Sequence, residues 1–150
     1  MTVYINTTVI GDQQVFLSIK GFENRANDLT VPLKEARLTM LRSVKQNFEQ
    51  SGRPIPWLSL AYSTLKQKLR LGRSPLPLIR TGDLKRSITG AIANQNRLII
   101  GTAIKYARIH QRRNFSAKIP ARPYLVFQDR DLVHIRKSLV NHLFGGKFRA

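Results

Sequence analysis

A long apolar stripe in the first third of the chain constrains the fold more than any other feature. From Leu33 to Phe48, apolar side chains recur at spacings of three and four residues, which places them on one face of a helix. Thr30 and Pro32 are typical of a helix start, and Ser51-Gly52 is typical of a helix end. The spacing predicts a long N-terminal helix whose apolar face must be covered by other elements.

Two β-hairpins are predicted around this helix. Thr2–Ile10 and Gln14–Lys20 are rich in β-branched and aromatic residues, and Gly11-Asp12 lies between them as a turn signal. This pattern predicts an N-terminal hairpin within residues 1–20. Thr89–Ala93 and Arg97–Thr102 are joined by Asn-Gln-Asn, in which Asn tolerates the positive φ of a tight turn, and they predict a central hairpin.

Further helices are predicted on the C-terminal side of the long helix. They are expected at residues 59–71, in a short segment after Asp83, at residues 104–111 and at residues 129–143, and residues 145–150 are expected to be a flexible tail. At 150 residues the chain fits a single domain. The expected fold class is α+β, with a small antiparallel sheet of two hairpins packed by the long N-terminal helix and by the C-terminal helix.

Positive charge is the most unusual part of the composition. The chain has 26 Lys and Arg against 8 Asp and Glu, a net charge of +18, and no acid lies between Glu49 and Asp83 or between Asp83 and Asp129. Nucleic acid is the default partner of such a surface, and an acidic protein face is the next candidate. The absence of Cys excludes disulfides and thiolate metal sites. No apolar run reaches the ~20 residues of a membrane span, so no membrane association is predicted.

The segment KYARIHQRRNFSAKIPARPYL, residues 105–125, combines basic residues with aromatic residues and prolines. Three interpretations are open: a nucleic-acid grip, a catalytic loop around His110, or a surface that docks another protein. A general base needs a group that orients it, and no acid is near His110 in the sequence. No metal-ligand spacing and no phosphate-binding loop is present. We therefore predict no catalytic residue, no metal and no cofactor.

Two prolines stiffen the backbone around Arg122 and lower the entropy cost of presenting its guanidinium in one direction. Such an Arg suits an acidic groove on a neighbouring subunit, or it is a plain surface charge on a bend. Trp57, between Pro56 and Leu58, is more often a core anchor than a ligand platform.

The order of the motifs resembles that of the phage virion morphogenesis family, which contains the tail-completion proteins of Mu-like and P2-like contractile-tailed phages. The resemblance runs from Leu33 to about Leu143 and depends on LIRTGDL (78–84), IGT (100–102), YA (106–107), IHQ (109–111) and IPARPYL (119–125). Relatives usually carry an aromatic residue and a Gly soon after IHQ, whereas this chain has RRNF (112–115). The residues taken as the structural signature are Trp57, Thr64, Thr81, Gly82, Leu84, Gly101, Pro120 and Pro123.

The resemblance implies a non-enzymatic α+β assembly protein that works as a homo-oligomeric ring at the neck or tail end of the virion, after assembly in the host cytoplasm. Its partners would be phage tail and head or neck proteins, with non-specific contact to DNA passing through the ring. The candidate interface residues are Tyr106, His110, Gln111, Arg112, Arg113, Phe115, Arg122 and Tyr124. The candidates for the DNA channel are Lys66, Lys68, Arg70 and Lys118. The alternative interpretation is a basic nucleic-acid-binding module.

Overall fold

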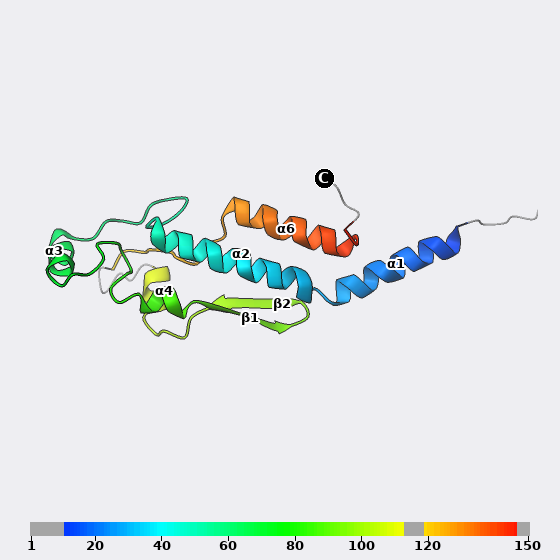
Figure 1. Cartoon of the computed structure of the whole chain (residues 1–150), viewed down its shortest axis with the longest axis horizontal. Helices are drawn as coiled ribbons and strands as arrows, with labels where there is room; N and C mark the ends of the chain where they lie inside the picture. Colours follow the sequence, from blue (N-terminus) through cyan, green and yellow to red (C-terminus); the bar gives the residue numbers. More distant parts are fainter. Residues whose placement is uncertain (1–10, 113–118, 147–150) are drawn as a thin grey trace, which may run out of the picture.

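A computed structural model describes residues 11–112 and 119–146 as an elongated molecule (Figure 1). The elements in chain order are α1 (Asp12–Asn27), α2 (Thr30–Glu49), α3 (Tyr62–Arg70), α4 (Asp83–Ser87), β1 (Thr89–Asn94), β2 (Arg97–Gly101), α5 (Ala107–Gln111) and α6 (Asp129–Leu143). No helix in these two ranges combines the length and the apolar character that crossing a membrane requires. The α+β class predicted from the sequence is confirmed, with six helices and one two-stranded antiparallel sheet in the described part of the chain.

Helix α2 is the central layer of the molecule, between the β1–β2 hairpin on one side and α6 on the other (Figure 1). Ala36, Met40, Val44 and Phe48 are buried along it, which confirms the apolar stripe. In the hairpin, Thr89 pairs with Gly101 and Ile92 pairs with Leu98. The hairpin approaches α2 closely at Gly90, where a Cβ would lie 2.7 Å from Cγ of Arg37. A Cβ at this position would therefore require the Arg37 side chain or the hairpin to shift.

Helix α6 begins and ends where the sequence predicts. Gln128 and Asp131 form a reciprocal capping box, in which the backbone N–H of Gln128 donates to Oδ2 of Asp131 at 3.2 Å. Asp129 and Asp131 lie in the first turn, where the helix dipole favours negative charge. Asp131 also accepts a hydrogen bond from the hydroxyl of Ser43 on α2. The same carboxylate therefore caps α6 and fixes it to the central helix.

The core lies at the C-terminal end of α2. Phe48 is fully buried, and its ring contacts Trp57 at 5.8 Å between centroids and Tyr124 at 5.5 Å. Leu84 closes the same cluster with an exposure of 2%. Nε1 of Trp57 donates to the carbonyl oxygen of Pro123 at 2.9 Å, so the polar atom of the buried indole is satisfied. The prediction that Trp57 is a core anchor is confirmed.

The predicted N-terminal hairpin is wrong where it can be tested. Gln14–Lys20 lies within helix α1, while the other predicted strand, Thr2–Ile10, falls outside the described residues. Val15, Ile19 and Phe22 are spaced at four and three residues, as in a helix, and Asp12 places a carboxylate at the positive end of the helix dipole. The β-branched composition of this short segment was therefore a weaker signal than its spacing.

Other boundaries differ in detail. Helix α3 begins at Tyr62, three residues after the predicted Ser59, and α5 begins at Ala107, after the predicted Ile104. Residues 147–150 of the predicted tail lie outside the described residues.

Candidate functional site

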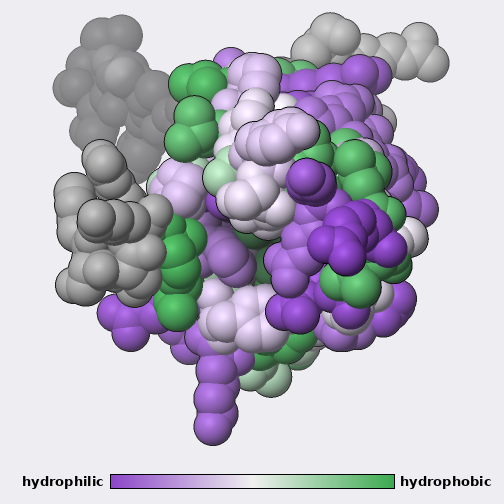
Figure 2. Space-filling model, turned by 90° about the vertical axis from the view of Figure 1, so that its left-hand side faces the viewer, coloured by the Kyte–Doolittle hydropathy of each residue, from purple (hydrophilic) through white to green (hydrophobic). Residues whose placement is uncertain are grey.

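A hollow of about 760 Å³ lies at the end of the molecule that carries α3 and α4. Figure 2 looks onto this end, which is hollowed near its centre and lined by residues of mixed hydropathy. Leu60, Leu71, Leu78, Ile79 and Leu84 provide the apolar part of the lining. The cationic part consists of Lys68, Arg73, Arg80 and Arg122. The site therefore combines apolar surface with a concentration of positive charge.

Lys68 is the buried residue of α3, with an exposure of 9%. Its Nζ donates to the carbonyl oxygen of Leu76 at 2.6 Å. Burial, followed by the charges of Arg122 and Arg73, lowers the pKa of Lys68 below its ordinary value. A buried ammonium usually has a carboxylate beside it, but here its charged neighbours are cations. Desolvation and like charge therefore both oppose the charged form of Lys68.

Arg122 is also buried, with an exposure of 8%. Its Nε donates to the carbonyl oxygen of Leu58 at 3.0 Å and its Nη2 to that of Ser59 at 3.2 Å. Burial lowers the pKa of Arg122. The guanidinium is thus held by neutral carbonyl groups, which fix its orientation but do not neutralise its charge.

His110 completes the polar lining of the hollow. Its Nδ1 is buried and has no hydrogen-bond partner within the described ranges, and its ring meets that of Tyr106 edge-on at 6.0 Å. Burial, followed by the charge of Arg122, lowers the pKa of His110 below its ordinary value of 6.5. The neutral imidazole is therefore favoured, because a charged one would be a further cation in this hollow.

The depressed pKa of His110 predicts a loss of stability in mild acid. Below about pH 6.5 the unfolded chain protonates this imidazole while the folded chain resists protonation, so the unfolded state binds more protons and the free energy of unfolding falls as pH falls. We expect His110→Gln to reduce this slope between about pH 7.5 and 5.5 in denaturant titrations. The matched control is His134→Gln, because His134 is exposed on α6. An unchanged slope in His110→Gln would contradict the prediction.

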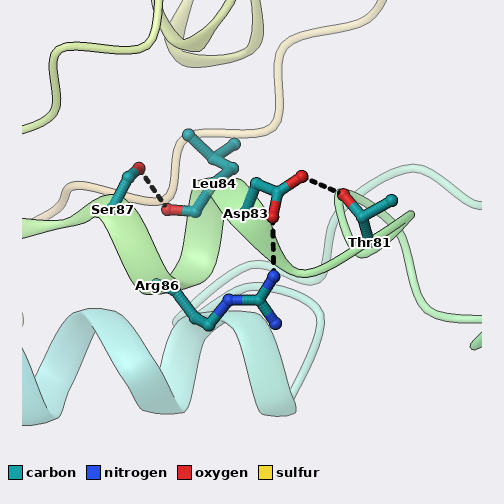
Figure 3. Close-up of polar contacts among 5 residues, drawn as sticks. All are labelled: Thr81, Asp83, Leu84, Arg86 and Ser87. Carbon is teal, nitrogen blue, oxygen red and sulfur yellow. Dashed lines mark hydrogen bonds and ion pairs between the residues drawn. The ribbon is translucent and has the colours of Figure 1, made fainter.

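Asp83 carries the one carboxylate among the described residues that line the hollow. Its carboxylate accepts a hydrogen bond from the Thr81 hydroxyl and forms an ion pair with Arg86, whose Nη2 lies 2.6 Å from Oδ1 (Figure 3). The hydrogen bonds from Thr81 and then from Arg86 lower the pKa of Asp83. Because this carboxylate is already engaged, it leaves the cations of the hollow without a matched counter-charge. The site can therefore accept an anionic group, and carboxylate or phosphate is the chemistry that fits.

Two of the motif stretches are joined behind this hollow by Gln111. Its Oε1 accepts the backbone N–H groups of Tyr124 at 3.2 Å and Leu125 at 3.1 Å, while its Nε2 donates to the Leu125 carbonyl at 2.8 Å. The backbone N–H of Arg122 donates to the His110 carbonyl at 2.8 Å. Nδ2 of Asn47, which is fully buried on α2, donates to the Tyr124 carbonyl at 3.0 Å. These bonds fix the bend formed by residues 119–125, and with it the orientation of Arg122.

We expect Gln111→Ala to lower the free energy of unfolding by about 2–3 kcal/mol, because it leaves backbone groups of Tyr124 and Leu125 without partners. Chemical denaturation of the purified protein measures this loss. The matched control, Gln50→Ala, alters an exposed glutamine and should change stability by less than about 0.5 kcal/mol. Equal effects of the two variants would contradict the role given to Gln111.

The remaining predicted site residues lie in different parts of the molecule. Tyr106, Arg112, Lys66 and Arg70 are exposed, whereas Tyr124 is buried in the core with an exposure of 5%. Thr64, Thr81, Gly82 and Leu84 line the hollow, Gly101 ends β2, and Pro120 and Pro123 are partly buried in the bend. Arg113, Phe115 and Lys118 lie outside the described residues. Contact of any of these residues with another subunit or with DNA stays a prediction.

Comparison with known proteins decides the family. A family model described as the phage virion morphogenesis family matches residues 10–144. The chain belongs to the phage virion morphogenesis family. It is 38% identical over 109 residues to Mu-like prophage FluMu G protein 2 of Haemophilus influenzae, which covers 69% of this chain and 70% of that relative. No solved structure matches the chain significantly.

For this member of the phage virion morphogenesis family, the sequence did not reveal Arg73 and Arg80 as part of the site, nor the burial of Lys68. One signal was available for Lys68. It follows Thr64 by four residues and Leu65 by three, which continues the inward side of the predicted helix. Arg73 and Arg80 lie in irregular chain, where no periodicity shows which way a side chain points.

Proposed function

We propose that this chain is a structural assembly protein of the virion that acts in tail completion and head–tail joining at the neck, as an oligomeric ring. Membership of the phage virion morphogenesis family and the relationship to a Mu-like prophage protein support a role in phage assembly. The finer assignment to tail completion and to a ring is our inference. In this role the protein binds other proteins and catalyses no reaction.

One structural observation carries the proposal. The stretches 78–84, 109–111 and 119–125, on which the family resemblance depends, all contribute to the walls of one hollow or to the bend behind it. They build a rigid concavity whose buried cations lack a counter-charge. Fixed cations beside apolar surface are typical of protein interfaces, where buried Arg and large apolar side chains carry most of the binding energy.

The experiment combines mass and microscopy. Light scattering of the purified chain should give the mass of a closed oligomer, and particles produced without the protein should contain separate tails and filled heads. Restoring the gene should restore joined virions. A protein that remains monomeric at high concentration, or virions that mature normally without it, would overturn the proposal.

Nucleic-acid binding is the second candidate function, and the exposed Lys66 and Arg70 on α3 together with the net charge of +18 favour it. Affinity for duplex DNA should then fall with a slope of about −0.9 per contacted phosphate in a plot of log K against log salt. An assembly protein should show only weak and unspecific retention of DNA. A defined sequence preference would favour this second function over the first.

A further inference from the structure

Helix α1 has no buried residue along its whole length. It projects from the body as an arm, at the end of the molecule opposite to α3 (Figure 1). Within the described residues it is attached through its C-terminal part, by a hydrogen bond from Nε of Arg25 to the Leu143 carbonyl at 2.8 Å, a contact of His142 Nε2 with the Arg25 carbonyl at 3.1 Å and a ring contact between Phe22 and Phe144. Val15, Phe16, Leu17 and Ile19 on the free part each expose about 60% of their surface.

The exposed arm needs a partner to be stable. Most helices in proteins owe their stability to packing of an apolar face, which the free part of α1 lacks, and α1 carries Gly21 in its interior, which costs about 1 kcal/mol relative to Ala. Four neighbouring large apolar side chains on a projecting helix also exceed the scattered exposure that is ordinary for a surface. A surface that covers the free part of α1 would remove this exposure.

Charge favours a second copy of the chain as the partner that contacts the free part of α1. Helix α1 carries Asp12 and Glu23 against Lys20 and Arg25, a net charge of zero, whereas the whole chain carries +18. Most faces of two such chains repel each other, but a neutral arm approaches another copy without that penalty. Asp12 also places an exposed carboxylate near the free end of the arm.

The hollow has the apolar surface and the positive charge that would complement this arm. It presents the apolar side chains of Leu60, Leu71 and Ile79 beside cations without a matched counter-charge. We propose that the hollow of one copy receives the α1 arm of the next, with apolar side chains of the arm against the apolar wall and the Asp12 carboxylate toward the cations. The proposal rests on the oligomer of the proposed function and specifies the contact that builds it.

The geometry is consistent with closure into a ring. The arm and the hollow lie at opposite ends of the subunit, so their contact is heterologous, and repeated heterologous contacts form either a ring or an open filament. Duplex DNA fits the hollow less well than a helix does. Its phosphates lie on a wide rigid rod, while Lys68 and Arg122 are more than nine-tenths buried and lie beside apolar groups that phosphate does not use.

Cross-linking between two variants of the full chain tests the contact, and the absence of native Cys removes background. Phe16→Cys marks the arm and Leu71→Cys, at the exposed edge of the hollow, marks the receiving end. Mixed in the presence of a short bismaleimide, this pair should link at least about tenfold faster than the matched pair Phe16→Cys and Val133→Cys, because docking raises the effective concentration of the thiols. Val133 is 65% exposed on α6 and lies outside the hollow.

Three results would overturn this contact. The first is an equal rate of linking for the two pairs, and the second is a faster rate for the pair with Val133→Cys. The third is that duplex DNA, but not added protein, protects Leu71→Cys from alkylation. Asp12→Asn, which removes the charge at this exposed position without placing a cation at the start of α1, should slow the linking of Phe16→Cys to Leu71→Cys by about tenfold. Light scattering of the parent chain distinguishes a failure of this contact from a failure of the proposed function. An oligomer without arm-to-hollow links would refute the contact and leave the proposed function standing, whereas a persistent monomer would refute both.

Discussion

Phe48→Ala is expected to lower the free energy of unfolding by about 3–5 kcal/mol. The Phe48 ring is fully buried and packs against Trp57 and Tyr124 at the point where α2 meets the bend of residues 119–125. Truncation removes its buried area and leaves a cavity between two further aromatic rings, which the rigid bend cannot close. The bend is fixed by Gln111 and Asn47, so collapse around the missing ring is restricted.

Thermal and denaturant unfolding of purified variants measure this effect. For a chain of this size a loss of 1 kcal/mol lowers the melting temperature by about 2–4 °C, so Phe48→Ala should lower it by roughly 6–20 °C. The matched control is Leu38→Ala on the same helix, where the side chain is 55% exposed and the cost should stay below about 1 kcal/mol. A Phe48→Ala protein as stable as the Leu38→Ala protein would show that the core lies elsewhere.

The sequence predicts elements well where an apolar period is long or a cap is strong. Helix α2 has a sustained stripe, and α6 has two carboxylates in its first turn, so both were predicted closely. The N-terminal segment has neither advantage, because no residue of α1 is fully buried and its apolar residues cover a wide arc. Its composition therefore favoured a strand, and its spacing alone indicated a helix. Local patterns are ambiguous where little packing within the chain selects between a helix and a strand.

The candidate site was predicted only in part, because the sequence indicated which residues belong to it but not which of them are buried. The sequence predicted that His110, Gln111, Arg122 and Tyr124 belong together, and hydrogen bonds bring them together. It also predicted outward contacts for them, which stay a prediction, and it did not predict that Tyr124 and Arg122 are buried within the chain. Burial of a cation follows from tertiary packing, and one sequence contains no local signal for it. Composition showed that positive charge was in excess, but it could not show which cations the fold would remove from water.

Lys68 and Arg122 are held by carbonyl oxygens, and desolvation lowers the pKa of both. Lys68 loses hydration and lies near other cations, and among the described residues its Nζ donates to the carbonyl oxygen of Leu76 at 2.6 Å. A residue kept purely for stability would be replaced by an apolar one of similar length, since such replacements are often neutral or stabilising. A fold that retains the charge despite this cost is expected where an anion arrives from outside.

Lys68→Met is therefore expected to separate stability from assembly. Methionine keeps the length of the stem and removes the charge, so relief of repulsion by Arg122 and Arg73 offsets the lost hydrogen bond to Leu76, and the free energy of unfolding should change by no more than about 1 kcal/mol. A contact that loses a buried charged partner weakens by about 2–5 kcal/mol, which is roughly 30-fold or more in affinity. We expect a comparable loss of joined virions when this variant replaces the parent gene, counted by plaque assay and by microscopy.

Lys66→Met is the matched control, two residues away on the same helix, where the side chain is exposed and lies outside the hollow. If the hollow is the docking site, Lys66→Met should yield joined virions at the parental level, because an exposed charge contributes little to a specific contact. If the basic face of α3 instead lines a passage for DNA, Lys66→Met should impair joining at least as much as Lys68→Met. A stable Lys68→Met protein that joins tails at the parental level would remove the hollow from the mechanism, because its buried charge would then serve neither the fold nor the assembly.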